Sequence, residues 1–368
     1  MISRLRDELG GECAVVGIMS GSFTQRGEPA LLDKSTRAAC AIAGGCDLVL
    51  ELPAPWSMAG AAFFARGGVA IANGLGCVDL LAFGSETGDL PSLLETSERL
   101  ASEEYAAAVA SARAADPAAQ TGTLRARVFA ELYGGSAHLT GSNDLLALAY
   151  LDALRELGSA IRPHVIQRVG EAYNSIEIPS VRMESHASAS AIRTKVLAGE
   201  DVSAFVPPYT AKALMSAPIH RTSNLDRTVA AFLRLTPPEH IHGRMEISGG
   251  IENKLCRAAM KQTTLEGIVA ACTERRYSPS RLRRAVFGGM LGYTMSDCEA
   301  LPLYTVPLAM NERGREVLAL ARKRASIAIL SGASAYRSLS EAGKRQLEAA
   351  RRADLLHELA KEEKGIPR

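Results

Sequence analysis

Residues 14–52 read AVVGIMSGSFTQRGEPALLDKSTRAACAIAGGCDLVLEL, and this stretch decides the fold that the sequence predicts. Its two ends, 14–19 and 47–52, are apolar runs typical of buried strands, and 34–43 carry small apolar side chains at helical spacing. The same alternation continues with apolar runs at 78–83 and 162–169 and helical patterns at 57–74, 92–114, 123–133, 145–157 and 188–198. Strands that alternate with helices predict an α/β fold with a parallel sheet covered on both faces.

The pattern changes after about residue 202. Prolines interrupt it at 207–208 and 237–238, strands become scarce, and helical patterns occupy 253–271, 280–291 and 338–363. A length of 368 residues suits two domains. We therefore expect a ligand-binding α/β domain over residues 1–200 and a mainly helical domain over residues 201–368.

Composition limits the classes of function. The net charge of +2 predicts no nucleic-acid partner by itself, so any such surface must be a local patch. No run of about 18 apolar residues predicts a membrane span. Seven scattered cysteines form no CxxC pair, which favours free thiols and a cytoplasmic protein.

Polar residues gather at the ends of the predicted strands, where parallel sheets bind ligands. The densest group is the loop 19–34, which holds Ser20, Arg26, Glu28 and Lys34 and can present N–H groups and cations to an anion. A solvated surface loop is the alternative. Glu51 lies in an apolar run, so we expect it to pair with Arg26 or Lys34, or to be structural.

Three further segments carry candidate residues. Gly84, just past a strand, allows a base or ribose to approach the backbone closely, and a plain turn is the alternative. Ser188, Ser190 and Arg193 at a helix start can form a phosphate cradle, and a simple N-cap is the alternative. The basic segment 253–284 suits an RNA backbone and an unstacked base, and a solvated helical face is its alternative. The candidate RNA contacts are Arg275, Arg276, Tyr277, Arg281 and Arg284.

No metal site is predicted. His240 and His242 form an HxH pair beside Glu239, but the sequence offers no convincing third ligand.

Taken together, the motifs resemble one family over nearly the whole chain. They are MSGSFTQRGEPA (19–30), KSTRAACAIAGGCDLVLELP (34–53), FGSETGD (83–89), SNDLLALAY (142–150), SASAIR (188–193), GGIENKL (249–255) and RRYSPSRLRR (275–284). In this order they are similar to the bacterial tRNA(Met) cytidine acetate ligases, whose fold is a Rossmann-like nucleotidyltransferase domain followed by a helical tRNA-binding part. The resemblance implies an enzyme that activates acetate with ATP as acetyl-adenylate and transfers the acetyl group to N4 of the wobble cytidine of elongator tRNA(Met).

The resemblance also implies roles for particular residues. Gly84, Asn143 and the Arg168–Val169 pair fall on the family's nucleotide contacts, and Ser188 to Arg193 on a second phosphate-binding motif that includes Ser190. The loop from Ser20 to Lys34 would lie beside acetate and the α-phosphate. We expect Lys34, Arg168 and Arg193 to supply positive charge, and Mg²⁺ to accompany ATP, held largely by phosphates and water.

One departure from the family concerns its first strand and the following H-x-G-H loop. Residues 1–9 resemble the helix that follows that loop, and no H-x-G-H string occurs. We expect a start roughly twenty residues upstream, the length of a strand and phosphate loop. Without that inner strand the sheet would be open, so the chain as given is expected to be poorly stable and inactive in adenylation. A non-catalytic RNA-binding homologue and a small-molecule adenylyltransferase are the competing hypotheses.

Overall fold

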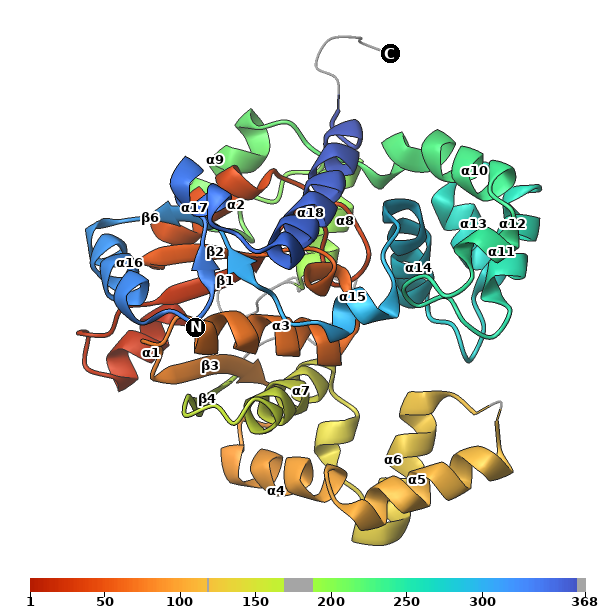
Figure 1. The fold of residues 1–368 in the computed structure, drawn as a ribbon, viewed down its shortest axis with the longest axis horizontal. Helices are drawn as coiled ribbons and strands as arrows, with labels where there is room; N and C mark the ends of the chain where they lie inside the picture. Colours follow the sequence, from red (N-terminus) through yellow and green to blue (C-terminus); the bar gives the residue numbers. More distant parts are fainter. Residues whose placement is uncertain (118, 169–187, 363–368) are drawn as a thin grey trace.

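The computed structural model describes residues 1–117, 119–168 and 188–362 (Figure 1). The first half alternates strands and helices as the sequence predicts. Its elements are α1 (Ile2–Glu8), β1 (Val16–Ser20), α2 (Lys34–Ala43), β2 (Leu48–Leu52), α3 (Ala61–Gly74), β3 (Leu80–Ser85), α4 (Leu90–Leu100), α5 (Glu103–Ala115), α6 (Thr121–Tyr133), α7 (Ser142–Glu156) and β4 (Arg162–Gln167). The predicted helix 92–114 is two helices, because Ser102 caps a new helix with its side chain.

The strands form two separate parallel pairs. β1 pairs with β2 in the register Val16↔Leu48, and β3 pairs with β4 in the register Leu80↔Arg162. Within the described residues, no strand pairs with the second edge of β1 or of β3. Ile18 of β1 and Leu81 of β3 nevertheless pack against one cluster, formed by α3 and α7.

The second half contains a helical unit and then returns to the first. Helices α8 (Ala189–Ala198), α9 (Pro208–Ser216), α10 (Asp226–Leu235), α11 (Pro238–Ile241), α12 (Ile251–Ala259), α13 (Leu265–Cys272), α14 (Pro279–Leu291) and α15 (Met295–Glu299) come first. The predicted helix 253–271 is split between α12 and α13, because Thr264 caps α13. Most of the large apolar cluster belongs to this helical unit. Helices α10 to α14 lie together at the right of Figure 1.

The last 60 or so described residues pack against the α/β part, and the division of the chain into domains at residue 200 stays a prediction. They form β5 (Tyr304–Thr305), β6 (Pro307–Met310), α16 (Glu312–Arg324), β7 (Ala328–Ile329), α17 (Ala333–Arg337) and α18 (Glu341–Leu359). β6 pairs antiparallel with β2 in the register Leu48↔Met310, and α18 lies across the loop that follows β1 (Figure 1). The site is therefore built from both ends of the sequence.

Two expectations from composition can be compared with the structure. All seven cysteines are free, as the sequence predicts. No helix in the described part of the chain is both long and apolar enough to cross a membrane.

Candidate active site

One guanidinium fixes both ends of the loop 20–34. Arg37 of α2 donates to the carbonyl oxygens of Ser20 at 2.9 Å, Leu32 at 3.0 Å, and Gly21. Burial lowers the pKa of Arg37 to about 10, despite the nearby carboxylates of Glu51 and Asp33, so the group stays cationic at neutral pH. Ser20 thus stands at the end of β1 in a loop whose backbone is held in place.

Arg193 of α8 holds the middle of the same loop. Its Nε lies 3.0 Å from Oε2 of Glu28, and its Nη2 donates to the carbonyl oxygen of Pro29 at 3.0 Å. Arg283 of α14 faces the other oxygen of Glu28 at 3.6 Å. Burial lowers the pKa of Arg193, while Glu28 opposes that effect. The structure therefore places Arg193 at this loop with its charge paired to Glu28, and its contact with a phosphate stays a prediction.

Lys34 lies between two carboxylates. Its Nζ is 3.0 Å from Oε1 of Glu51 and 2.8 Å from Oδ2 of Asp354, which comes from α18. Ser22 of the loop donates to the second oxygen of Asp354 at 2.6 Å. Of the two partners expected for Glu51, the structure selects Lys34. Asp354 was not predicted, because its position in the amphipathic pattern of α18 carries no local signal for a site.

Burial and charge oppose each other in this cluster. Burial acts to lower the pKa of Lys34, but Glu51 and Asp354 outweigh it and raise the pKa. Glu51 is 4% exposed, and burial raises its pKa in spite of the Lys34 ammonium. A cavity of about 550 Å³ opens over these groups, walled by residues of β5, α17 and α18. The cluster is therefore the polar floor of a cavity at the end of β2.

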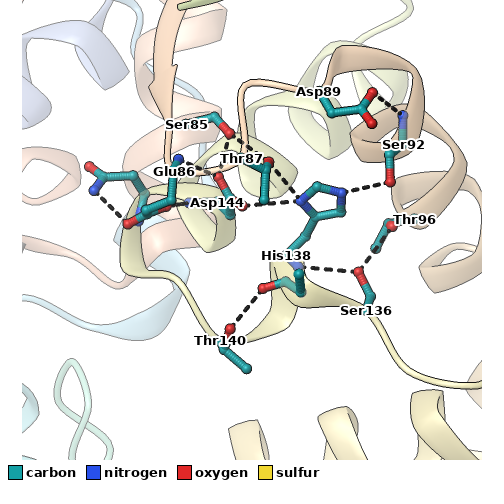
Figure 2. Close-up of polar contacts among 12 residues, drawn as sticks. Ser85, Glu86, Thr87, Asp89, Ser92, Thr96, Ser136, His138, Thr140 and Asp144 are labelled. Atoms are coloured by element: carbon teal, nitrogen blue, oxygen red, sulfur yellow. Dashed lines mark hydrogen bonds and ion pairs between the residues drawn. The ribbon is translucent and has the colours of Figure 1, made fainter. Parts of the chain in front are cut away.

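The predicted nucleotide side of the site lies at the end of β3, where Glu86 organises the start of α7 (Figure 2). Its Oε1 accepts hydrogen bonds from the backbone N of Asn143 at 2.9 Å and from Nδ2 of Asn143 at 2.7 Å. Its Oε2 accepts from the backbone N of Asp144 at 2.7 Å. A carboxylate at a helix N-terminus satisfies free N–H groups and favours the helix dipole. The predicted contact Asn143 is thereby fixed against the 83–89 loop.

The buried side chains of His138 and Asp144 hold the 83–89 loop in place (Figure 2). Asp144 accepts from the backbone N of Glu86 at 2.8 Å and from the Ser85 hydroxyl, and its Oδ2 lies 3.1 Å from Nδ1 of His138. His138 Nε2 lies 2.8 Å from the Ser92 hydroxyl. Burial disfavours a charged Asp144, but hydrogen bonds from Ser85 and His138 prevail and lower its pKa. Sequence reasoning missed both residues, although Asp144 directly follows Asn143.

Gly84 and Arg168 are brought together on paired strands. A β-carbon built on Gly84 would lie 3.2 Å from Cγ of Arg168, so a larger residue would displace that side chain. The backbone N of Arg168 donates to the carbonyl oxygen of Ser85 at 2.9 Å, while its side chain is exposed. Val169, predicted beside it, lies outside the described residues.

The serines of the 188–193 motif begin α8. Ser188 is buried and is the N-cap, and its hydroxyl accepts a hydrogen bond from the backbone N of Ala191 at 3.1 Å. Ser190 is half-buried, and its carbonyl accepts from the Thr194 hydroxyl at 3.0 Å. Ser188 therefore has the capping geometry of the simpler alternative, and its phosphate contact stays a prediction.

The basic segment divides into paired and exposed cations. Glu246 forms ion pairs with Arg281, at 3.3 Å, and with Arg284, at 2.9 Å, and Arg284 also donates to the carbonyl oxygen of Gln25 in the loop. Arg275 and Arg276 are exposed. Tyr277 is only 4% exposed, and its hydroxyl donates to the carbonyl oxygen of Ser248 at 2.9 Å. The tyrosine ring is thus packed in the core of this structure, and its contact with RNA stays a prediction.

One group of described residues lies within metal-ligand range, namely His220, His357 and Glu358. The two imidazole rings stack with centroids 3.8 Å apart and planes at 16°. Ring nitrogens have their lone pairs in the ring plane, so stacked rings direct them along parallel lines, away from a common point. His357 Nε2 also donates to the carbonyl oxygen of Ala30 at 2.9 Å. This geometry does not fit a metal ion.

A parallel-stranded α/β unit with polar loops at its strand ends is typical of the nucleotide-binding class of α/β proteins. The family described as HIGH Nucleotidyl Transferase matches residues 1–366. Among solved structures, the apo form of Thermotoga maritima TmcAL superposes with a TM-score of 0.89 at 25% identity, covering 97% of this chain and 90% of that one. The same protein bound with alpha-thio ATP gives a TM-score of 0.86 at 25% identity, with the same coverage.

Curated relatives narrow the class further. The tRNA(Met) cytidine acetate ligase of Acetivibrio thermocellus is 32% identical over 93% of this chain and 86% of its own length. The enzyme of the same name from Syntrophotalea carbinolica is 35% identical over 89% of this chain and 80% of its own length. The chain therefore belongs to the tRNA(Met) cytidine acetate ligase family, as its motifs indicate.

Proposed function

We propose that this protein uses ATP to activate acetate and transfers the acetyl group to N4 of the wobble cytidine of elongator tRNA(Met). The observation that carries the proposal is the 32% identity to a tRNA(Met) cytidine acetate ligase over 93% of the chain. Support comes from the two anchored loops, 20–34 and 83–89, which follow the carboxyl ends of β1 and β3.

The chemistry consists of two displacements. An acetate oxygen bonds to the α-phosphorus of ATP and pyrophosphate leaves; then cytidine N4 bonds to the acetyl carbon, the bond to the phosphate oxygen breaks, and AMP leaves while N4 loses one proton. Both steps depend on alignment and on positive charge. We assign Arg168, whose side chain is exposed beside Gly84, to the phosphates. Arg193 and Lys34 are assigned to holding the loop beside the acetate, since both are paired with carboxylates.

The proposed ligase function also implies binding partners, which are part of the proposal. Mg²⁺ is expected to arrive with ATP and to be held by phosphates and water, which suits a site whose carboxylates already have partners. Arg275 and Arg276 are proposed as contacts to the tRNA backbone, because they are exposed. The protein is proposed to work in the cytoplasm, where tRNA, ATP and acetate meet.

The test is a reaction of the purified protein with ATP, radiolabelled acetate and unmodified elongator tRNA(Met). We expect label in the tRNA, with AMP and pyrophosphate formed in equal amounts, and no label when the wobble cytidine is replaced by uridine. Acetate-dependent exchange of pyrophosphate into ATP, without tRNA, measures the first step alone. Adenylation of an added metabolite without any transfer to tRNA would instead identify a small-molecule adenylyltransferase.

A second candidate is RNA binding without adenylation. The observation that favours it is the exposed pair Arg275 and Arg276 in the basic segment 253–284. Salt-sensitive tRNA binding with no pyrophosphate exchange would establish this function. Label transferred to tRNA by the 368-residue chain would exclude it.

A further inference from the structure

The tip of the loop 20–34 packs directly on helix α14 of the helical unit. Gly27 has φ +70°, in the left-handed region, and a β-carbon built on it would lie 2.5 Å from the backbone N of Arg284. Both its conformation and this close approach therefore require glycine. Beside it, the buried Phe23 contacts the Phe287 ring of α14, with ring centroids 5.2 Å apart. The shape of the loop tip thus depends on α14.

The two arms of the loop are joined by backbone hydrogen bonds. The backbone N of Thr24 donates to the carbonyl oxygen of Glu28 at 2.9 Å, and the backbone N of Ala30 donates to that of Ser22 at 2.9 Å. Ser22 lies two positions after the end of β1. Because closely packed structure transmits displacement, a shift of the tip also moves the base of the loop.

The side chain of Arg284 connects this tip to a strained acidic residue. Its Nη1 donates to the carbonyl oxygen of Gln25 at 3.3 Å, and its Nε donates to Oε1 of Glu246 at 2.9 Å. Glu246 has φ +63°, and among the described residues it alone, apart from glycines, has a positive φ. Such a conformation costs free energy in a glutamate, and it persists where surrounding contacts hold it.

The guanidinium of Arg284 is already occupied within the protein. Only 14% of its side chain is exposed, and its Nη2 also lies 2.9 Å from Oε1 of Glu246. All three of its nitrogens therefore have protein partners, on the carboxylate or on the loop. Arg275 and Arg276, in contrast, are exposed. Arg284 is thus placed to support the loop rather than to contact an RNA backbone.

We propose that Arg284 is a positioning residue for the activation of acetate, and that Glu246 fixes its guanidinium in the orientation that supports the loop tip. Arg284 touches no substrate in this assignment and acts through the backbone of Gln25 and Gly27. The inference rests on the proposed function, which places the loop 20–34 beside acetate. The nucleotide loop at Gly84 is a different segment, so acetate and ATP should respond differently to the loss of Arg284.

The experiment measures acetate-dependent exchange of pyrophosphate into ATP, without RNA, at varied acetate and at varied ATP. The test variant is Arg284→Ala. Arg244→Ala is the matched control, because Arg244 is a half-buried arginine that donates to the carbonyl oxygen of Gly292 within the helical unit. Arg284→Ala is expected to raise the KM for acetate by about tenfold and to leave the KM for ATP unchanged. Arg244→Ala is expected to change neither.

Two further variants separate positioning from folding. Glu246→Gly removes the carboxylate and also relieves the positive φ, so the chain should still fold, and the KM for acetate should rise as in Arg284→Ala. Arg284→Lys keeps the charge but replaces the planar guanidinium by one ammonium group, so it should restore part of the affinity for acetate. An unchanged KM for acetate in Glu246→Gly would overturn the role given to this pair.

Hydrogen exchange of the amides in the loop 20–34, measured by mass spectrometry, tests the positioning without any reaction. Exchange should be faster in Arg284→Ala than in the wild-type protein or in Arg244→Ala. Unchanged exchange would overturn the proposal, as would a lower maximal rate with both KM values unchanged.

RNA binding distinguishes the competing role of Arg284. The slope of the logarithm of the tRNA-binding constant against the logarithm of the salt concentration should be the same in Arg284→Ala and in the wild-type protein. A slope reduced by about 0.7–1 would make Arg284 a phosphate contact and overturn the proposal. Failure of the proposed function is seen separately, as absent pyrophosphate exchange in the wild-type protein, and the hydrogen-exchange comparison then still decides whether Arg284 positions the loop.

Discussion

A buried histidine pair makes the stability of this protein sensitive to acid. His357 of α18 is 2% exposed, stacks on His220, and donates to the carbonyl oxygen of Ala30 in the loop 20–34. Burial lowers the pKa of His357 to about 4, outweighing the hydrogen bond to Ala30, and burial also lowers the pKa of His220. Acid should therefore act directly where α18 holds the loop.

The magnitude follows from the two pKa values. The unfolded chain titrates His357 near 6.5 and the folded chain near 4, so between these values the unfolded state binds more protons. The free energy of unfolding is therefore complete above about pH 6.5 and falls as the pH falls. His357 alone removes about 2 kcal/mol between pH 7.5 and 5, and about 3 kcal/mol by pH 4. His220 acts in the same direction.

The assay is urea unfolding at pH 7.5, 6, 5 and 4, followed by fluorescence of the single Trp56, which is buried. The variant His357→Gln keeps a donor for Ala30 but does not titrate in this range. Its free energy of unfolding should fall less than that of the wild-type protein, by about 2 kcal/mol at pH 5. His240→Gln, at an exposed position, is the control and should follow the wild type. Parallel loss of stability in the wild-type and His357→Gln proteins would refute the reasoning.

Four other substitutions test the remaining parts of the site. Arg37→Lys keeps the charge but loses the planar guanidinium that donates to three carbonyl oxygens of the loop 20–34. Acetate-dependent pyrophosphate exchange should therefore fall at least about tenfold while RNA binding is kept. An unchanged exchange rate would contradict the role of Arg37 in holding this loop. Asp144→Asn removes the charged acceptor that bonds to the 83–89 loop and to His138. It should lower the free energy of unfolding by about 1.5–3 kcal/mol and raise the KM for ATP. Unchanged values would contradict the role of Asp144 in holding this loop. Arg275→Ala and Arg276→Ala should each weaken tRNA binding. Each should also reduce the slope of the logarithm of the binding constant against the logarithm of the salt concentration by about 0.7–1. An unchanged slope would show that the residue does not contact the tRNA backbone.

Local signals identified most of the elements that carry the site. Residues 34–43 form α2 with the predicted bounds, because Asp33 caps the helix and two glycines follow it. The strands β1 to β4 lie within a few residues of the predicted apolar runs, since burial on both faces leaves a continuous apolar signature. The pairing of Glu51 with Lys34 was one of the alternatives that the sequence offered, because a carboxylate in an apolar run is costly without a partner.

The identity of partners distant in sequence was beyond such signals. Asp354 reaches Lys34 across 320 positions, and β6 adds to β2 from the far end of the chain. Tyr277 looked like an interleaved aromatic in a basic run, yet it is buried because α14 packs that segment into the helical core. The same packing pairs Arg284 with Glu246 and leaves Arg275 exposed.

The sequence by itself determined which residues begin helices, which runs are buried as strands, and which loops stand at strand ends, because caps and periodicity act over a few residues. Only the tertiary structure decided which charges meet. The cluster of Lys34, Glu51 and Asp354 exists because α18 returns across the loop. Burying a charge is costly unless an opposite charge arrives with it, and that pairing depends on how distant elements pack.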